Sequence, residues 1–264
     1  GIECGGAVGG FGHGRPAQAK RAMRREYIGC MPTGLLQGFL RRLPSQCVVC
    51  HHWPGARVCE QCVQAFAQPR SRCSTCALPM PEGVVQCGAC LRSPPPVDRC
   101  LAALPYRFPW AALLGDFKFR EHTGLATSFA TLLRSTPWVE PALEACDLLL
   151  PIPLGPQRLR QRGYNQALVL ARALEPRKLQ AHWLQRHHDT PEQHQLPRDA
   201  RLRAMKGAFA VDPLQAPRLR GQRVVLLDDV MTTGATLWEA SRVLRQHGVA
   251  HITALALARA DGDD

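Results

Sequence analysis

Residues 224–236 read Val-Val-Leu-Leu-Asp-Asp-Val-Met-Thr-Thr-Gly-Ala-Thr, and they decide the fold class of this 264-residue chain. Residues 224–227 form a continuous apolar run with β-branched members, which predicts a strand that is buried on both faces of a parallel sheet. Apolar residues then recur at helical spacing from Leu237, so we expect a helix to begin near Thr236. In open α/β sheets, ligands bind beyond the carboxyl ends of the strands, where the intervening loop would lie.

Two carboxylates and a phosphate-sized loop follow this strand directly. Asp228 and Asp229 would repel a phosphate, so vicinal hydroxyls or a divalent cation beside a phosphate are their natural targets. The loop offers backbone N–H groups, hydroxyls and a helix N-terminus to an anion, and its residues are Thr232, Thr233, Gly234, Ala235 and Thr236. The simpler alternative is a strand end with acidic residues that interact favourably with the dipole of the next helix. It would explain one aspartate near a helix start but not the complete sequence of strand, acid pair and loop. A sugar phosphate satisfies both halves of the motif.

Composition and charge limit the classes of protein. No apolar run reaches the ~18–20 residues that span a bilayer, so we expect no membrane insertion. Residues 1–45 contain no apolar core of the signal-peptide type, which predicts a cytoplasmic location. The formal net charge is +12, and its positive part is concentrated in residues 1–45 and 155–206. This distribution favours attraction to polyanions, although an ordinary solvated surface explains the N-terminal cluster equally well.

Eight of the twelve cysteines form four CxxC pairs, which are Cys47/Cys50, Cys59/Cys62, Cys73/Cys76 and Cys87/Cys90. Such pairs can present both sulfurs to one tetrahedral Zn²⁺ ion, so the eight predict two closed structural zinc sites. We favour sequential pairing, which gives two short ribbons, over interleaving the first pair with the third and the second with the fourth. His51 and His52 could act as ligands, but we expect them to be exposed. Four cysteines receive no functional role, and one of them, Cys146, is expected to be a small buried hydrophobe; the four are Cys4, Cys30, Cys100 and Cys146.

The chain is expected to contain three regions. Residues 1–45 form a basic, disordered extension with a short helix around 35–43, residues 46–96 a double zinc ribbon, and residues 97–264 an α/β domain. Strands are expected at 101–108, 147–152, 181–186, 207–211, 223–227 and 251–257. Helices are expected at 110–119, 125–133 and 165–174. This alternation predicts a mainly parallel sheet.

A second basic segment follows the strand expected at 147–152. Residues 153–164 are expected to form a loop that contains Arg158, Arg160 and Arg162. Arginine matches phosphate oxygens bidentately and keeps its charge, so Arg158 and Arg162 are candidates to hold a pyrophosphate group. The simpler alternative is an exposed basic loop that caps the next helix through Asn165.

The acid pair and its loop resemble the signature of type I phosphoribosyltransferases, which bind 5-phosphoribosyl-1-pyrophosphate (PRPP). The resemblance implies that Asp228 and Asp229 bind the ribose 2- and 3-hydroxyls, and that residues 232–236 wrap the 5-phosphate. It also implies that Mg²⁺ binds together with PRPP. Arg158 and Arg162 would then offset charge on the pyrophosphate.

The order of motifs over residues 46–258 resembles the competence protein F (ComF) family. The motifs are the four cysteine pairs, Tyr106, Lys118-Phe119, Pro151-Ile152-Pro153, Arg162-Gly163-Tyr164-Asn165-Gln166, Gly207-Ala208-Phe209 and the acid-pair loop. The resemblance implies a type I phosphoribosyltransferase-like domain with an N-terminal double zinc-ribbon module, linked to natural competence and DNA uptake. Single-stranded DNA and a DNA-uptake helicase-type protein are the partners it suggests.

Two details of this resemblance concern single positions. The family usually carries a closing segment with Gln-x-x-Leu, basic residues and an Asn; here residues 193–196, Arg201 and Arg203 match, but Ala204 stands where the Asn is expected. We expect Tyr106 and Lys118 to pack in the core rather than to contact a ligand.

Three functions are compatible with these motifs. The first is a phosphoribosyltransferase of nucleoside metabolism that releases pyrophosphate, with the segment 187–206 closing to exclude water. The second is a single-stranded-DNA-binding module, for which Trp53 and Phe66 are the stacking candidates. The third is a sensor that reports PRPP without turnover. No nucleophile, base or acceptor can be named from the sequence, so no catalytic residue is assigned, and the oligomeric state is left open.

Overall fold

The computed structural model describes residues 45–119, 122–187 and 204–261. These residues belong to one compact unit. Residues 1–44 of the extension expected at 1–45 lie outside the described residues, and so do the helix around 35–43 and the family-like positions 193–196, Arg201 and Arg203. The division between residues 46–96 and 97–264 stays a prediction, because both parts belong to the same unit.

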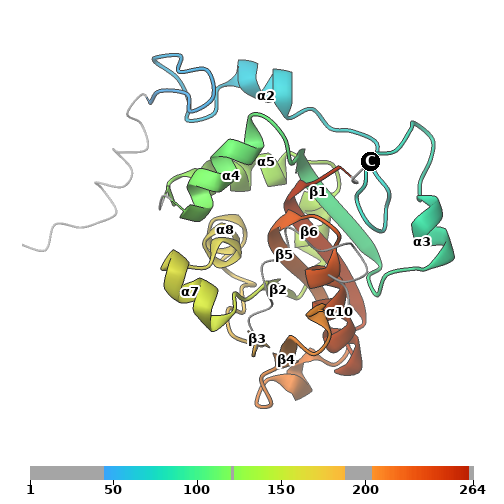
Figure 1. Cartoon of the computed structure of the whole chain (residues 1–264). Coiled ribbons are helices and arrows are strands. Elements are labelled where there is room, and N and C mark those ends of the chain that lie inside the picture. The colour runs from blue at the N-terminus through green and yellow to red at the C-terminus, as the bar shows by residue number, and fades with distance from the viewer. Residues whose placement is uncertain (1–44, 120–121, 188–203, 262–264) are drawn as a thin grey trace, which may run out of the picture. The chain divides into compact units, whose positions relative to one another are not determined.

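A four-stranded sheet forms the centre of the structure, and all of its neighbouring strands run parallel (Figure 1). The strand order is β1-β6-β5-β2, and the strands are β1 (Arg99–Pro105), β2 (Leu148–Pro151), β5 (Arg223–Met231) and β6 (His251–Arg259). Residues 224–227 of β5 are buried, as expected of a strand that is covered on both faces. The α/β fold with a parallel sheet is confirmed.

Helices cover both faces of this sheet, and β5 shows why. Alternate residues of a strand point to opposite faces, and Val225 and Leu227 pack in one core cluster while Val224 and Leu226 pack in another. The first cluster contains residues of α4 (Trp110–Phe119), α5 (Leu125–Arg134), α6 (Val139–Ala145) and α8 (Gln166–Leu174). The second contains residues of α10 (Ala235–Gln246) and of an antiparallel pair, β3 (Leu184–Arg186) and β4 (Phe209–Val211). Figure 1 shows α4 and α8 on one side of the sheet and α10 on the other.

The cysteine-rich region consists of two small ribbons. An antiparallel bridge lies within each ribbon, at Ser45 and Gly55 in the first and at Arg72 and Pro79 in the second. A short helix carries the last cysteine of each ribbon: α2 (Glu60–Phe66) contains Cys62, and α3 (Gly88–Arg92) contains Cys90. Both ribbons therefore close locally, as sequential pairing requires.

The main differences from the sequence expectations have local causes. Residues 156–162 form a helix, α7 (Pro156–Arg162), instead of the expected loop. Pro156 occupies its first turn and Gly163 ends it with φ of +74°, which is a common way to begin and to stop a helix. The strands expected at 181–186 and 207–211 exist in shortened form but pair with each other outside the main sheet. Helix α6 and the 3₁₀ helix at Ala216–Leu219 were not expected.

No helix in the described part of the chain combines the length and the apolar character that a membrane crossing needs.

Candidate functional site

The acid pair lies inside β5, near its carboxyl end, rather than after it. The strand continues to Met231, and Asp228 pairs in register with Ala256 of β6. Asp229 is buried, and its Oδ2 lies 3.2 Å from Nζ of Lys118 in α4. Burial, together with the neighbouring Asp229 charge, raises the pKa of Asp228 to about 7. The Asp229 carboxylate is thus balanced by Lys118, whereas the Asp228 carboxyl is partly protonated near neutral pH. A bound hydroxyl donor or cation would favour the ionised form of Asp228.

The loop after β5 is shaped by Gly234, which precedes the first residue of α10. Its φ is +85°, a conformation that glycine adopts without strain. A Cβ atom at this position would lie 2.5 Å from the ring of Trp238, so no larger side chain fits between the loop and the helix. The first N–H groups of a helix have no partner within it, and those of α10 begin at Ala235. Oγ1 of Thr233 accepts a 3.4 Å hydrogen bond from N of Ala235.

The carboxyl end of α4 connects the acid pair with the second basic motif. Nε2 of the buried Gln166 donates a 3.2 Å hydrogen bond to O of Lys118. The hydroxyl of Tyr164 donates to O of Phe117, and the two rings meet edge to face with centroids 6.3 Å apart. Lys118 is thereby held at the point where it meets Asp229. Tyr164 and Gln166 of the second basic motif and Asp229 of the acid pair are far apart in sequence, but all three contact the last turn of α4.

The two arginines predicted to hold pyrophosphate both lie in α7. Arg158 is half-buried. The guanidinium of Arg162 lies over the ring of Phe119, 5.1 Å from its centroid, and Nη1 donates a 3.1 Å hydrogen bond to Oε1 of Gln166. Asn165 caps α8, because its Oδ1 accepts from N of Leu168, and its Nδ2 donates to O of Ile152. The helix-capping role of Asn165 is therefore confirmed, and the phosphate-binding role of the arginines remains a prediction.

Arg259, at the end of β6, anchors the beginning of the loop. Its side chain is buried, and Nη1 donates to O of Met231 at 3.3 Å and to O of Thr232. Its Nε donates a 2.9 Å hydrogen bond to O of Cys76 in the second ribbon. One guanidinium therefore joins a cysteine knuckle to the first residue of the predicted phosphate loop. Arg259 could not be predicted as a site residue, because nothing local in the sequence marks an arginine in an apolar strand as a loop anchor.

The eight cysteines form two groups of four, Cys47/Cys50/Cys59/Cys62 and Cys73/Cys76/Cys87/Cys90. This grouping confirms the sequential pairing. Four sulfurs that lie about 2.3 Å from a tetrahedral Zn²⁺ ion are about 3.8 Å apart. The measured Sγ···Sγ distances are 3.8 Å for Cys47 and Cys62 and 3.7 Å for Cys76 and Cys87. These distances fit a zinc cage and are far longer than the ~2.05 Å of a disulfide, so each group could hold a structural zinc ion.

The backbone around the sulfurs supports the same assignment. N of Cys59 donates to Sγ of Cys47 at 3.4 Å, and N of Cys87 donates to Sγ of Cys73 at 3.3 Å. Burial acts to raise the pKa of Cys47 and Cys73, but these and other backbone N–H donors outweigh it and lower both values to about 6. One thiolate in each group of four cysteines, at Cys47 and at Cys73, is thus favoured, and thiolate is the form that binds zinc. His51 and His52 are exposed and belong to neither group, as expected.

Two residues depart from the core-packing roles that we expected. Tyr106 is 38% exposed, so the expectation of core packing is wrong for it. Lys118 lies in the ion pair with Asp229, so the side chain belongs to the candidate site. Its position next to Phe119 in the family-like motif was a usable signal for a site residue. Cys146 is buried, as expected.

Comparisons with known proteins agree with the geometry. Residues 168–263 match the phosphoribosyl transferase domain family. The chain is 32% identical over 241 residues to the DNA utilization protein YhgH of Salmonella typhimurium, covering 82% of this chain and 98% of that protein. It is 32% identical over 218 residues to competence protein F of Haemophilus influenzae, covering 76% and 89% respectively. Competence protein ComFC of Bacillus subtilis is 29% identical over 154 residues, covering 55% of this chain and 58% of that protein.

Proposed function

Because the chain belongs to the competence protein F (ComF) family, we propose that it binds PRPP with Mg²⁺ at the carboxyl end of β5 and acts in DNA uptake or utilisation. The observation that carries this proposal is the joint placement of the acid pair and the glycine loop at one end of a buried parallel strand. A phosphoribosyl group needs both parts, since its ribose offers two adjacent hydroxyls and its 5-phosphate needs N–H donors.

Each part of the ligand has a matching group in the chain. Asp228 and Asp229 accept hydrogen bonds from the ribose 2- and 3-hydroxyls. Residues 232–236 and the amino end of α10 bind the 5-phosphate through backbone N–H groups and hydroxyls. Arg158 and Arg162 lie in α7, and Arg162 is tied to Phe119, the residue after Lys118. These arginines supply positive charge to the pyrophosphate, and Mg²⁺ neutralises part of its remaining charge when bound.

Transfer of the phosphoribosyl group is the catalytic form of this proposal. An acceptor would attack C1 of PRPP, the bond from C1 to pyrophosphate would break, and pyrophosphate would leave with the electron pair. Pyrophosphate release that depends on an added base or nucleoside supports transfer. Binding of PRPP without release for any acceptor supports a sensor. No described side chain is assigned as the nucleophile or base.

Calorimetric titration with PRPP and Mg²⁺ tests the site. The double variant Asp228→Asn/Asp229→Asn should bind PRPP at least a hundredfold more weakly, because two charge-assisted hydrogen bonds of about 1.5–3 kcal/mol each are weakened. The matched control is Glu60→Gln/Glu82→Gln, which removes two exposed carboxylates in the ribbons and should bind as the wild type does. Equal affinity of the aspartate variant and the wild type contradicts the proposal.

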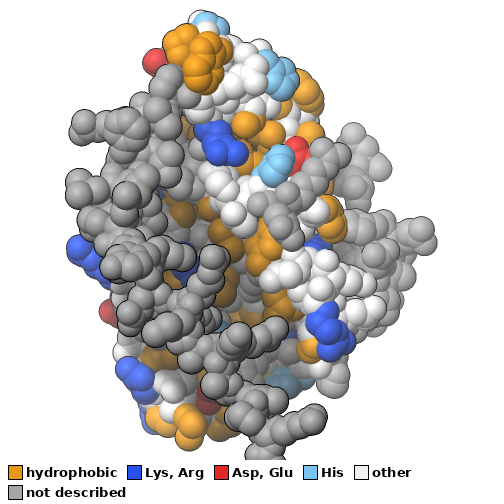
Figure 2. All heavy atoms as spheres, turned by 90° about the vertical axis from the view of Figure 1, so that its left-hand side faces the viewer, with side chains coloured by type: hydrophobic (Ala, Val, Ile, Leu, Met, Phe, Trp, Pro, Cys, Tyr) orange, Lys and Arg blue, Asp and Glu red, His pale blue; other side chains and the backbone are white. Residues whose placement is uncertain are grey.

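Single-stranded DNA is the second candidate ligand, and exposed aromatic rings favour it. Phe108 is 73% exposed and meets Phe66 edge to face with ring centroids 5.7 Å apart, and Trp53 is 59% exposed. Figure 2 shows hydrophobic and basic side chains distributed over one face of the molecule. Such rings can stack on bases while arginines contact phosphates. Binding should weaken steeply with salt and should drop for Phe108→Ala; affinity that is independent of salt argues against it.

A cytoplasmic location and a helicase-type partner complete the proposal. None of the described cysteines forms a disulfide, a state that a reducing compartment maintains. Copurification of a helicase with the tagged chain, lost at high salt, tests the partner.

A further inference from the structure

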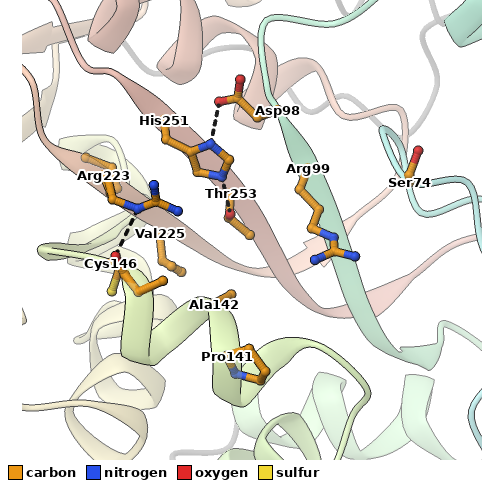
Figure 3. A pocket seen from close by; sticks show the side chains of 12 residues that line it. Ser74, Asp98, Arg99, Pro141, Ala142, Cys146, Arg223, Val225, His251 and Thr253 are labelled. Carbon is orange, nitrogen blue, oxygen red and sulfur yellow. Dashed lines mark hydrogen bonds and ion pairs between the residues drawn. The ribbon is translucent and has the colours of Figure 1, made fainter.

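A cavity of about 350 Å³ lies where three strands of the sheet begin, and Figure 3 shows the residues that line it. Because Asp228 and Asp229 lie near the carboxyl end of β5, the cavity is at the opposite end of the sheet from the acid pair. Arg99, Arg223 and His251 line the cavity, and these are the first residues of β1, β5 and β6. Along β5, Arg223 and Asp228 are separated by roughly 17 Å at about 3.3 Å per residue. The cavity is therefore distinct from the proposed PRPP site, and its volume suits a small ligand.

Two guanidinium groups reach this cavity without a carboxylate partner among the residues that the structure describes. Arg223 uses its Nε to donate a 3.0 Å hydrogen bond to O of Ala145, which leaves its two Nη groups without a partner within that part of the chain. The guanidinium of Arg99 lies 4.9 Å from the ring centroid of Trp138, in a cation–π contact. Figure 3 shows the two arginines on opposite sides of the cavity, with Thr253 between them.

The acidic residue that lines the cavity is already neutralised. Asp98 accepts a 2.6 Å hydrogen bond from N of Ile252 and also pairs with Nη2 of Arg245. Nδ1 of His251 lies 3.6 Å from the same carboxylate oxygen. Burial acts to raise the pKa of Asp98, but these donors outweigh burial and lower that pKa. The lining therefore has a net positive charge from Arg99 and Arg223, which favours an anion.

The remaining wall is apolar and comes mainly from α6. Pro141, Ala142 and Ala145 line it, and Val225 of β5 adds to it. Figure 3 shows the guanidinium of Arg99 extending toward Pro141 and Ala142. A flat ring could lie between a guanidinium plane and this wall, since arginine stacks readily on bases and aromatic rings. A plain sugar phosphate or inorganic phosphate would leave the apolar wall unused.

We propose that this cavity binds a nucleoside monophosphate, with the phosphate on Arg223 and the base between Arg99 and α6. The anion requirement comes from Arg223, whose Nη groups have no partner among the described residues and can form a bidentate contact with phosphate oxygens. The preference for a base comes from Arg99 and the apolar wall. Ser74 and Thr253 also line the cavity, and Oγ1 of Thr253 is already hydrogen-bonded to Nε2 of His251 at 3.3 Å. This site is independent of the proposed PRPP site.

Equilibrium dialysis of the full chain with AMP, adenosine and inorganic phosphate tests the proposal. PRPP and Mg²⁺ are present in excess, so that the proposed PRPP site is occupied and does not bind AMP. AMP should bind at least tenfold more tightly than adenosine or phosphate. Arg223→Gln and Arg99→Gln should each weaken AMP binding at least tenfold. The matched controls, Arg172→Gln and Arg177→Gln, change exposed arginines elsewhere and should have no effect. Unchanged AMP affinity in Arg223→Gln, or equal affinity for adenosine, overturns the proposal.

A location test does not depend on the PRPP site. Crystals of the Asp228→Asn/Asp229→Asn variant soaked in 8-bromo-AMP should show an anomalous bromine peak beside Pro141 and Ala142. This variant keeps the cavity intact while it disables the acid pair, so failure of the proposed PRPP function leaves the result interpretable. A bromine peak only at the loop after β5, or none in the cavity, overturns the proposal.

Discussion

The two ribbons have the same local design but different positions in the molecule. Each has a backbone N–H donor to the first sulfur and Sγ···Sγ distances near 3.7 Å. In the first, Cys47, Cys59 and Cys62 form a small cluster of their own, and Cys50 is exposed. In the second, Cys73, Cys76 and Cys90 belong to the core cluster that covers one face of the sheet.

The difference shows that a repeated motif can carry different structural demands. The second ribbon reaches the candidate site in one step, through Arg259. The first ribbon is connected to the candidate site only indirectly, by helix α4. At one end of α4, Nε1 of Trp110 donates to O of Phe66 in the ribbon, and near the other end Lys118 pairs with Asp229. We therefore expect the second ribbon to matter more for both stability and ligand binding.

The largest expected effect is the loss of the second zinc site. Cys73→Ser/Cys76→Ser should lower Tm by about 10 °C more than Cys47→Ser/Cys50→Ser, because several kcal/mol of core packing depend on the second ribbon. Differential scanning calorimetry measures Tm, and metal analysis should fall from about two zinc ions per chain to one in both variants. Equal losses of Tm contradict the comparison.

Arg259→Lys should have the next largest effect. A lysine ammonium cannot reproduce the planar fork that contacts both the ribbon and the loop, and a buried carbonyl left without a donor costs about 1–3 kcal/mol. We expect PRPP to bind about tenfold more weakly while both zinc ions remain. The exposed Arg172→Lys serves as the control in calorimetric titration. If Arg259→Lys binds PRPP normally, the ribbon does not position the loop.

Trp110→Phe should have a smaller effect, since it removes one hydrogen bond to the first ribbon but keeps most of the buried ring. The expected destabilisation is about 1 kcal/mol in urea unfolding, with PRPP affinity within about twofold of the wild type. If Trp110→Phe lost more PRPP affinity than Arg259→Lys, the first ribbon would matter more for ligand binding than the second, contrary to our expectation.

Stability should also depend on pH through Asp228, and changes in either ribbon should leave this dependence unaltered. The pKa of Asp228 is raised from 3.8 to about 7, so its stabilising contribution is complete below pH 3.8 and is lost as pH rises through 7. The free energy of unfolding should fall by at most about 4 kcal/mol over that range through this group. Asp228→Asn should remove this part of the slope, whereas Trp110→Phe should retain it. An unchanged slope in Asp228→Asn assigns the dependence to another group.

Elements with strong local patterns were predictable from the sequence. Four apolar residues before Asp228 predicted β5, and the spacing of the CxxC pairs predicted both sulfur groups. Helix α7 was missed because it buries no residue and so has no apolar periodicity. Arg259 was missed for another reason: it lies 183 residues from Cys76 in sequence, and only the folded sheet brings the two together. The ion pair of Lys118 and Asp229 depends in the same way on how α4 packs.

Arg259 also limits how ComF relatives can exchange parts. The ribbon at residues 70–92 cannot be transplanted alone, because its carbonyl at Cys76 and the carbonyl at Thr232 share one donor group. A chimera that takes this ribbon from a relative with a different residue at position 259 would need the matching end of β6 as well. The first ribbon carries no such shared donor among the described residues, so evolution or an engineer could replace it more freely.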